Sequence, residues 1–140
     1  MAGGSSNLDL VDDKLSILVV EDDPVYAEFV VTALRAVGHQ VEQVSTATEA
    51  SDRVRTRSPD AVILDLVLPD ASGYDIARKI RGELPASSVI ILLTADLYPQ
   101  RDLAEAVGID MVLSKPVEPA LVTGMIDLVR SRRRLKLSRR

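Results

Sequence analysis

The sequence contains no cysteine and no tryptophan, and it has a single histidine. Without cysteine, neither a disulfide nor a thiolate metal site is possible. Only 3% of the residues are aromatic whereas 46% are hydrophobic, so the core of a folded domain has to be aliphatic. The longest uninterrupted apolar run covers residues 89–93, too short to cross a membrane, and the N-terminus lacks the regions of a signal peptide. We therefore expect a soluble cytoplasmic protein that does not bind a membrane.

Charge is distributed unevenly along the chain. Residues 130–140 contain seven basic residues and no acidic residue, whereas residues 1–129 contain 10 basic and 21 acidic residues. This acidic body argues against direct nucleic-acid binding by the domain. The basic run has three interpretations: a solvated extension of the last helix, the start of a linker to an output domain, or a contact with nucleic acid or an acidic partner. By length and pattern we expect a disordered leader at 1–14, one domain at 15–130 and a basic C-terminal tail at 131–140.

Strand and helix patterns alternate along the domain. Predicted strands cover residues 16–20, 40–44, 61–66, 89–94 and 111–114, and predicted helices cover residues 24–37, 46–56, 73–83, 100–108 and the chain from 118 onward. Strands that are apolar on both faces are typical of a parallel sheet with helices on both sides. Five such units with right-handed crossovers predict an α/β domain with a doubly wound five-stranded parallel sheet. The strand order 2-1-3-4-5 is favoured, because it makes the two strands that end in carboxylates neighbours.

Acidic residues lie at the ends of the first and third predicted strands. Glu21, Asp22 and Asp23 come directly after the first, and Asp65 comes at the end of the apolar run 61–64 of the third. The carboxyl ends of parallel strands meet at one crevice, where carboxylates repel one another unless a cation or a proton intervenes. This arrangement predicts a Mg²⁺ site with Asp22 and Asp65 as direct ligands, the backbone carbonyl of Val67 as a third and Glu21 acting through water. Asp23 is assigned to capping the following helix.

Two further polar residues are expected at the same crevice. Thr94 ends the fourth predicted strand and Lys115 follows the fifth. A metal-bound carboxylate that faces a hydroxyl and an ammonium is suited to accept a phosphoryl group, so Asp65 is the predicted nucleophile and would form an aspartyl phosphate. The metal and Lys115 would neutralise the charge on the phosphoryl oxygens, and Thr94 would donate a hydrogen bond to one of them. Ala95 is small enough to leave the phosphate room.

Four stretches of the chain together resemble the receiver domain of two-component response regulators. They are ILVVEDDP at 17–24, DLVLPDASG at 65–73, LLTA at 92–95 and GIDMVLSKP at 108–116. The resemblance covers about residues 15–130 and implies a flavodoxin-like three-layer fold. It further implies that Asp65 is phosphorylated by a histidine kinase or a histidine phosphotransfer protein, that Glu21 and Asp22 help to bind Mg²⁺, and that Thr94 and Lys115 contact the phosphoryl group.

The resemblance has consequences beyond the site. It implies a cis peptide bond before Pro116. It implies a signalling domain, not an enzyme, that phosphorylates and dephosphorylates itself and passes the signal to a downstream protein, or to a second copy in a homodimer. The surface expected to change is formed by the predicted helix at 100–108, the strand at 111–114 and the last helix.

One position departs from the family pattern. Receivers commonly carry Tyr or Phe three residues before the lysine, and the inward rotation of that ring accompanies the movement of the hydroxyl toward the phosphate. This chain has Val112 there, so the usual aromatic switch is absent. Tyr98 either fills part of the vacated space or is a plain surface tyrosine.

Two other functional classes fit the residues less well. A nucleotide or flavin binder needs a loop after the first strand that cradles phosphate, and three acidic residues there repel phosphate. A phosphatase with an aspartyl intermediate places its nucleophile at the end of the first strand with a second Asp two residues on, which the stretch at 21–24 fits poorly. His39, the only histidine, is assigned to packing or to the surface and not to carrying phosphate. Asp96 is either a gate for water near the phosphate or a solvated loop acid.

Overall fold

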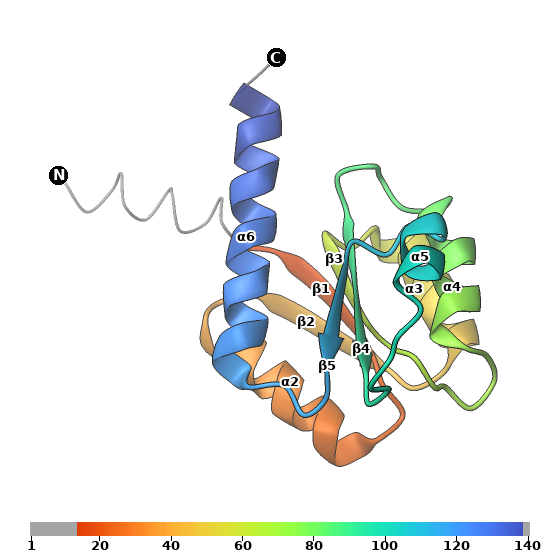
Figure 1. Ribbon diagram of the computed structural model, residues 1–140. Helices are drawn as coiled ribbons and strands as arrows, with labels where there is room; N and C mark the ends of the chain where they lie inside the picture. The colour runs from red at the N-terminus through yellow and green to blue at the C-terminus, as the bar shows by residue number, and fades with distance from the viewer. Residues whose placement is uncertain (1–13, 139–140) are drawn as a thin grey trace, which may run out of the picture.

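Five parallel strands form the centre of the protein, as a computed structural model shows for residues 14–138 (Figure 1). The strands are β1 (Ser16–Val20), β2 (Gln40–Val44), β3 (Ala61–Asp65), β4 (Val89–Thr94) and β5 (Met111–Ser114). Their order in the sheet is β2-β1-β3-β4-β5, and each neighbouring pair is parallel. The predicted fold class and strand order are confirmed.

Helices cover both faces of this sheet. They are α2 (Pro24–Ala36), α3 (Ala47–Arg57), α4 (Gly73–Arg81), α5 (Arg101–Ala106) and α6 (Pro119–Ser138). In Figure 1, α2 and α6 lie on one side of the sheet and α3, α4 and α5 lie on the other. All elements lie within two residues of the bounds predicted from the sequence.

The core consists of two aliphatic layers, one on each face of the sheet. Alternate strand residues face opposite layers, as the pleat of a strand requires. The layer under α3, α4 and α5 includes Leu18, Val20, Val62, Leu64, Ile90 and Leu92. The layer under α2 and α6 includes Ile17, Val19, Ile63, Ile91, Val122 and Ile126. Because both faces of the central strands are buried, their sequences read as continuous apolar runs.

Helix α2 has a capping residue before its first turn and a glycine after its last turn, as its sequence predicts. The Asp23 carboxylate accepts hydrogen bonds from the amides of Val25 (3.0 Å) and Tyr26 (3.3 Å), which confirms its role as the helix cap. At the other end Gly38 adopts φ +98°, the left-handed conformation that glycine accepts without steric cost. The next residue, His39, is buried, and its Nδ1 accepts a hydrogen bond from the Leu15 amide at 3.2 Å. The packing interpretation of His39 therefore holds.

Helix α6 continues into the basic run as far as Ser138 and extends beyond the edge of the sheet in Figure 1. The backbone of residues 131–138 is thus an extension of the last helix. Residues 139–140 of the predicted tail lie outside the described residues, as do residues 1–13 of the predicted leader. Within residues 14–138, no helix is long and apolar enough to span a bilayer.

Candidate functional site

The sheet register brings the predicted site residues to one edge. Glu21 directly follows β1, and its amide donates to the Val44 carbonyl at 3.0 Å. Asp65 is the last residue of β3 and pairs with Leu93, so Thr94 is one residue further along the neighbouring strand. Lys115 follows β5, and its amide donates to the Thr94 carbonyl at 2.8 Å. The ends of four strands thus place four polar residues at the carboxyl edge of the sheet.

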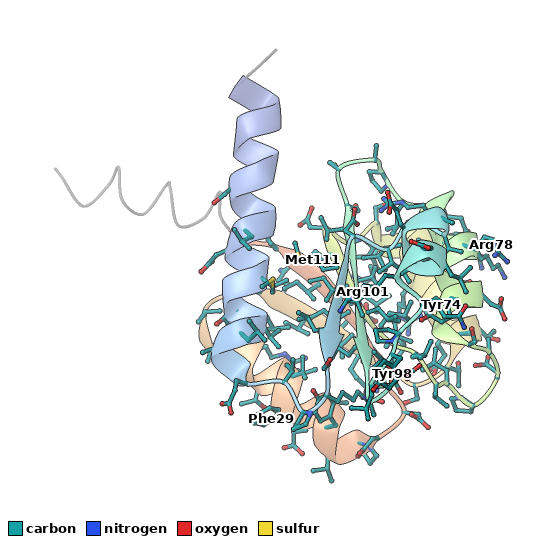
Figure 2. All side chains as sticks on the ribbon, in the orientation of Figure 1. Phe29, Tyr74, Arg78, Tyr98, Arg101 and Met111 are labelled. Atoms are coloured by element: carbon teal, nitrogen blue, oxygen red, sulfur yellow. The ribbon has the colours of Figure 1, made fainter. Side chains whose placement is uncertain are left out.

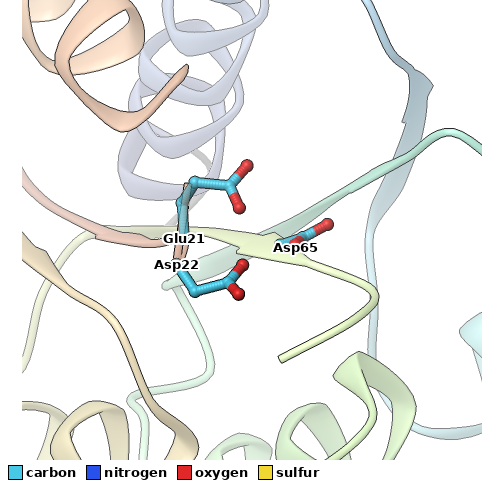
Figure 3. A group of neighbouring side chains, drawn as sticks. All are labelled: Glu21, Asp22 and Asp65. Carbon is cyan, nitrogen blue, oxygen red and sulfur yellow. The ribbon is translucent and has the colours of Figure 1, made fainter. Parts of the chain in front are cut away.

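Three carboxylates gather at this edge. One oxygen from each of Glu21, Asp22 and Asp65 lies within 4.8 Å of the others. Figure 3 shows Glu21 and Asp22 at the end of β1 and Asp65 at the end of β3, with their carboxylates directed to the same side. Glu21 is 3% exposed and Asp65 is 8% exposed, whereas Asp22 faces solvent. Oxygen donors in this arrangement fit a hard divalent cation, with open positions left for water.

The loop after β3 is held close to the strand end. Val67 pairs with Ser72 in an antiparallel bridge, where the Gly73 amide donates to the Leu66 carbonyl at 2.6 Å. A second bond runs from the Leu68 amide to the carbonyl of residue 71 at 3.2 Å, so the Val67 carbonyl takes part in neither bond. A Cβ on Gly73 would lie 2.7 Å from the carbonyl oxygen of Asp65 and 2.8 Å from the Leu66 Cα. Only glycine permits this close approach of α4 to the site.

The Lys115 ammonium lies among the buried carboxylates. Its Nζ is 2.6 Å from Glu21 Oε1 and 3.1 Å from Asp65 Oδ1. Burial, the largest single influence, lowers the pKa of Lys115, but the hydrogen bonds and charges of Glu21 and Asp65 together raise it above the ordinary value. The lysine is therefore a fixed positive charge beside Asp65.

Glu21 is buried beside the same charges, and its pKa is raised as well. Burial raises the pKa of Glu21 above its ordinary value, and the charge of Asp65 adds to the rise, while the hydrogen bond from Lys115 opposes it. The two carboxylates therefore retain part of their mutual repulsion even with the lysine present. A second cation at this point would relieve it.

Thr94 is buried, with 1% of its surface exposed, and its hydroxyl oxygen accepts a hydrogen bond from the Asp96 amide at 2.9 Å. This bond uses a lone pair of the hydroxyl and leaves its proton for donation. The Asp96 carboxylate in turn accepts from the Tyr98 amide at 3.0 Å, so it shapes the loop after β4. Ala95 lies exposed at the start of this loop.

Tyr26 also contacts the site, a role that the sequence did not lead us to predict. Lys115 Nζ lies 4.7 Å from the centroid of the Tyr26 ring, within the range of a cation–π contact. The phenol oxygen of Tyr26 accepts a hydrogen bond from the Val117 amide at 3.2 Å. Its place in the first turn of α2, directly after the acidic residues, is the sequence signal that points to this contact.

Val112, which stands in β5 where receivers commonly carry the aromatic switch residue, and Tyr98 can now be placed in the structure. Val112 is half-buried against the layer under α3, α4 and α5. Tyr98, which is labelled in Figure 2, lies in the loop between β4 and α5 and is 86% exposed. Tyr98 therefore does not fill space beside Val112 and is a surface tyrosine here. The Lys115–Pro116 peptide bond is cis, as the resemblance implied. A groove of about 580 Å³ lies on the face formed by α5, β5 and α6. The residues that line it include Arg101, Val112 and Met125.

The chain matches a known family of protein domains. The response regulator receiver domain family matches residues 17–127, and the chain belongs to this family. It is a receiver domain of two-component response regulators, which makes it a signalling domain.

Two relatives are mycobacterial regulators. The chain is 37% identical over 102 residues to the probable transcriptional regulatory protein TcrX of Mycobacterium tuberculosis, covering 73% of this chain and 44% of TcrX. It is 35% identical over 108 residues to the DNA-binding response regulator MtrA of Mycolicibacterium smegmatis, covering 74% of this chain and 45% of MtrA. The chain thus spans less than half the length of these relatives.

Solved structures show the same architecture. The receiver domain of the sensor histidine kinase PA1611 of Pseudomonas aeruginosa, solved with magnesium in its active site cleft, is 30% identical, with a TM-score of 0.76 and coverage of 84% of this chain and 98% of that chain. A CheY-like receiver domain protein from Methanospirillum hungatei has a TM-score of 0.82 over 88% of this chain and 98% of that chain. At 22% identity, the second likeness shows the fold alone.

Proposed function

We propose that Asp65 accepts a phosphoryl group from the phosphohistidine of a histidine kinase or a histidine phosphotransfer protein. The observation that carries this proposal is the position of the Lys115 ammonium, 3.1 Å from a buried carboxylate at the end of a strand. An Asp65 oxygen forms a bond to phosphorus as the phosphorus–nitrogen bond of the donor breaks. The imidazole nitrogen leaves with the electron pair and takes up a proton.

The other site residues stabilise the charge that this transfer brings. Lys115 lies where it can pair with a phosphoryl oxygen on Asp65 without a large movement, because its backbone is tied to Thr94 and its ammonium already lies beside Asp65. The Thr94 hydroxyl, which keeps its proton in the present hydrogen bond, is the donor to a second oxygen. Ala95 presents no bulk to the incoming group.

The acidic cluster supports a bound Mg²⁺, as in the magnesium-containing structure of the PA1611 receiver domain. Asp22 and Asp65 would be direct ligands, the Val67 carbonyl a third, and Glu21 would act through water. When bound, Mg²⁺ neutralises negative charge on the transferring phosphoryl oxygens. The exposed position of Asp22 leaves the cation reachable from solvent.

The phosphorylated form would signal through the face formed by α5, β5 and α6. The groove of about 580 Å³ on this face supports an interaction with a downstream protein or with a second copy of the chain. An aspartyl phosphate adds charge at Asp65 and shifts the population between two conformations of the adjoining loops. The relatives TcrX, a probable transcriptional regulatory protein, and MtrA, a DNA-binding response regulator, favour a DNA-binding output in a linked domain and not in the acidic receiver body. Phosphorylation and its spontaneous loss would take place in the cytoplasm.

Incubation with acetyl phosphate and Mg²⁺ tests the proposed function. Intact mass spectrometry should show the parent chain with the mass of one added phosphoryl group, lost again at alkaline pH as an acyl phosphate is. A phosphatase that uses an aspartyl intermediate would instead hydrolyse acetyl phosphate in many turnovers without retaining the group. That second result would replace the receiver mechanism with the phosphatase mechanism.

A further inference from the structure

The Lys115 ammonium contacts side chains from other elements of the fold. Lysine has a long, flexible side chain, and holding its ammonium in one place costs rotamer entropy. In this chain the ammonium has two kinds of contact: ion pairs with Glu21 and Asp65, and the face of the Tyr26 ring at a centroid distance of 4.7 Å. The contacts lie in different elements, since Tyr26 belongs to α2, Glu21 directly follows β1 and Asp65 is the last residue of β3.

The two kinds of contact respond differently to what the site binds. Glu21 and Asp65 belong to the group of carboxylates that suits a divalent cation, so a cation there competes with Lys115 for their charge. Phosphorylation of Asp65 changes one of these partners chemically. Neither event alters the Tyr26 ring itself, because the ring is uncharged and is not part of the acidic cluster.

Tyr26 also fixes the chain beyond the lysine. Its phenol oxygen accepts the hydrogen bond of the Val117 amide at 3.2 Å, and Val117 is buried in the layer under α2 and α6. On the other side of Lys115, its own amide is bonded to the Thr94 carbonyl. The ring of Tyr26 therefore covers the ammonium, while its hydroxyl anchors the backbone two residues further on.

We propose that Tyr26 is a positioning residue for the phosphoryl transfer: the face of its ring holds the Lys115 ammonium at Asp65, and its hydroxyl serves folding through Val117. This inference rests on the proposed function of Asp65. The two ends of the Tyr26 side chain thus have different roles. The ring supports the rate of phosphorylation of Asp65, and the hydroxyl supports the stability of the fold.

Two substitutions separate these roles. Tyr26→Phe keeps the ring and removes the acceptor for the Val117 amide, so it should lower the melting temperature and leave the rate of phosphorylation by acetyl phosphate close to that of the parent. Tyr26→Leu removes both contacts and should lower that rate by about 10-fold. Effects of this size are typical of residues that orient a functional side chain without touching the reacting atoms themselves. Phe29→Leu is the matched control, because this ring lies on the same helix, 6.2 Å from Tyr26 and 45% exposed.

Rates are measured by intact mass at saturating Mg²⁺ and below the lowest melting temperature, and Mg²⁺ binding is followed by thermal shift. Tyr26→Leu should keep the Mg²⁺ midpoint of the parent, because Tyr26 does not belong to the acidic cluster, and Phe29→Leu should keep both rate and midpoint. If Tyr26→Leu does not fold, Tyr26→Met gives the same comparison. A parent-like rate in Tyr26→Leu, or an equal loss of rate in Tyr26→Phe, would overturn the inference. Failure of the parent itself to take up phosphate would instead refute the proposed function.

Discussion

The Lys115 ammonium and the Glu21 carboxylate, 94 positions apart in the sequence, meet at 2.6 Å. Glu21 is 3% exposed, so the lysine balances a buried negative charge that lies next to Asp65. Most of the expected behaviour of the site follows from this relationship, because whatever removes the lysine leaves two carboxylates facing each other.

Replacing Lys115 with Met should both stop the chemistry and weaken the fold. The variant should take up phosphate from acetyl phosphate far more slowly than the parent. Because the lysine side chain is 20% exposed, the loss of stability should be about 2 kcal/mol, below the range for fully buried pairs. Urea unfolding in EDTA measures it. Added Mg²⁺ should restore more stability to Lys115→Met than to the parent, and a smaller gain in the variant would show that the carboxylates do not repel one another there.

Mg²⁺ should stabilise the parent chain by relieving the same repulsion. At a concentration of 100 times Kd, the gain in the free energy of unfolding would be about 2.7 kcal/mol. Since the chain has no tryptophan, thermal melts with Mg²⁺ and with EDTA are the suitable measurement. Asp22→Ala should lose most of this gain, whereas Asp75→Ala, which removes an exposed carboxylate outside the cluster, should keep it. Equal melting temperatures in Mg²⁺ and EDTA would argue against the metal site.

Asp70 should make the fold sensitive to acid. Its carboxylate accepts hydrogen bonds from the amides of Ala47 (2.8 Å) and Thr48 (3.2 Å) at the start of α3, and the bond from Ala47 is the main cause that lowers the pKa of Asp70. A carboxyl whose pKa is lower in the folded state contributes stability above its unfolded pKa, near 3.8, and loses it as the pH falls through the lower folded value.

Substitution of Asp70 by Asn should therefore remove part of the loss of stability below about pH 4. Urea unfolding from pH 3 to pH 7 would show this, with the parent and variant curves converging as the pH falls. Asp75→Asn is the matched control, since the only ion pair of Asp75 in the described part of the chain is a 4.0 Å contact with Arg78 on the same helix. Parallel curves for Asp70→Asn and the parent would contradict the assignment.

The sequence alone was sufficient to predict the positions of site residues that lie at strand ends. Asp65 and Thr94 could be placed because parallel strands end at one edge, so their position follows from the strand boundaries alone. Contacts between side chains of different elements could not be placed in this way. Tyr26 over Lys115 and Asp70 at the start of α3 depend on how a helix or loop docks, which periodicity does not encode.

Because Val112 replaces the usual aromatic residue, the coupling between the phosphate and the face of α5, β5 and α6 should be weaker than in receivers that carry Tyr or Phe at this position. Valine has no ring that can move between exposed and buried positions, so stabilisation of the active state has to come from Thr94, Lys115 and loop packing. Beryllofluoride, a phosphoryl mimic, should therefore shift the amide resonances of the loops after Asp65 and Thr94 strongly and those of β5 modestly. Large changes confined to residues 111–114 and α6 would show that another device replaces the aromatic residue. Tyr98→Ala would then be the first variant to examine.

The most direct test of the account is the intact mass of three proteins after incubation with acetyl phosphate and Mg²⁺: the parent, Asp65→Asn and Asp96→Asn. Asparagine at position 65 keeps the shape of the side chain and removes the nucleophile, while Asp96 lies in the neighbouring loop as an exposed acid. The parent and Asp96→Asn should each gain one phosphoryl group, and Asp65→Asn should gain none. If Asp65→Asn took up phosphate as fast as the parent, Asp65 would not be the acceptor.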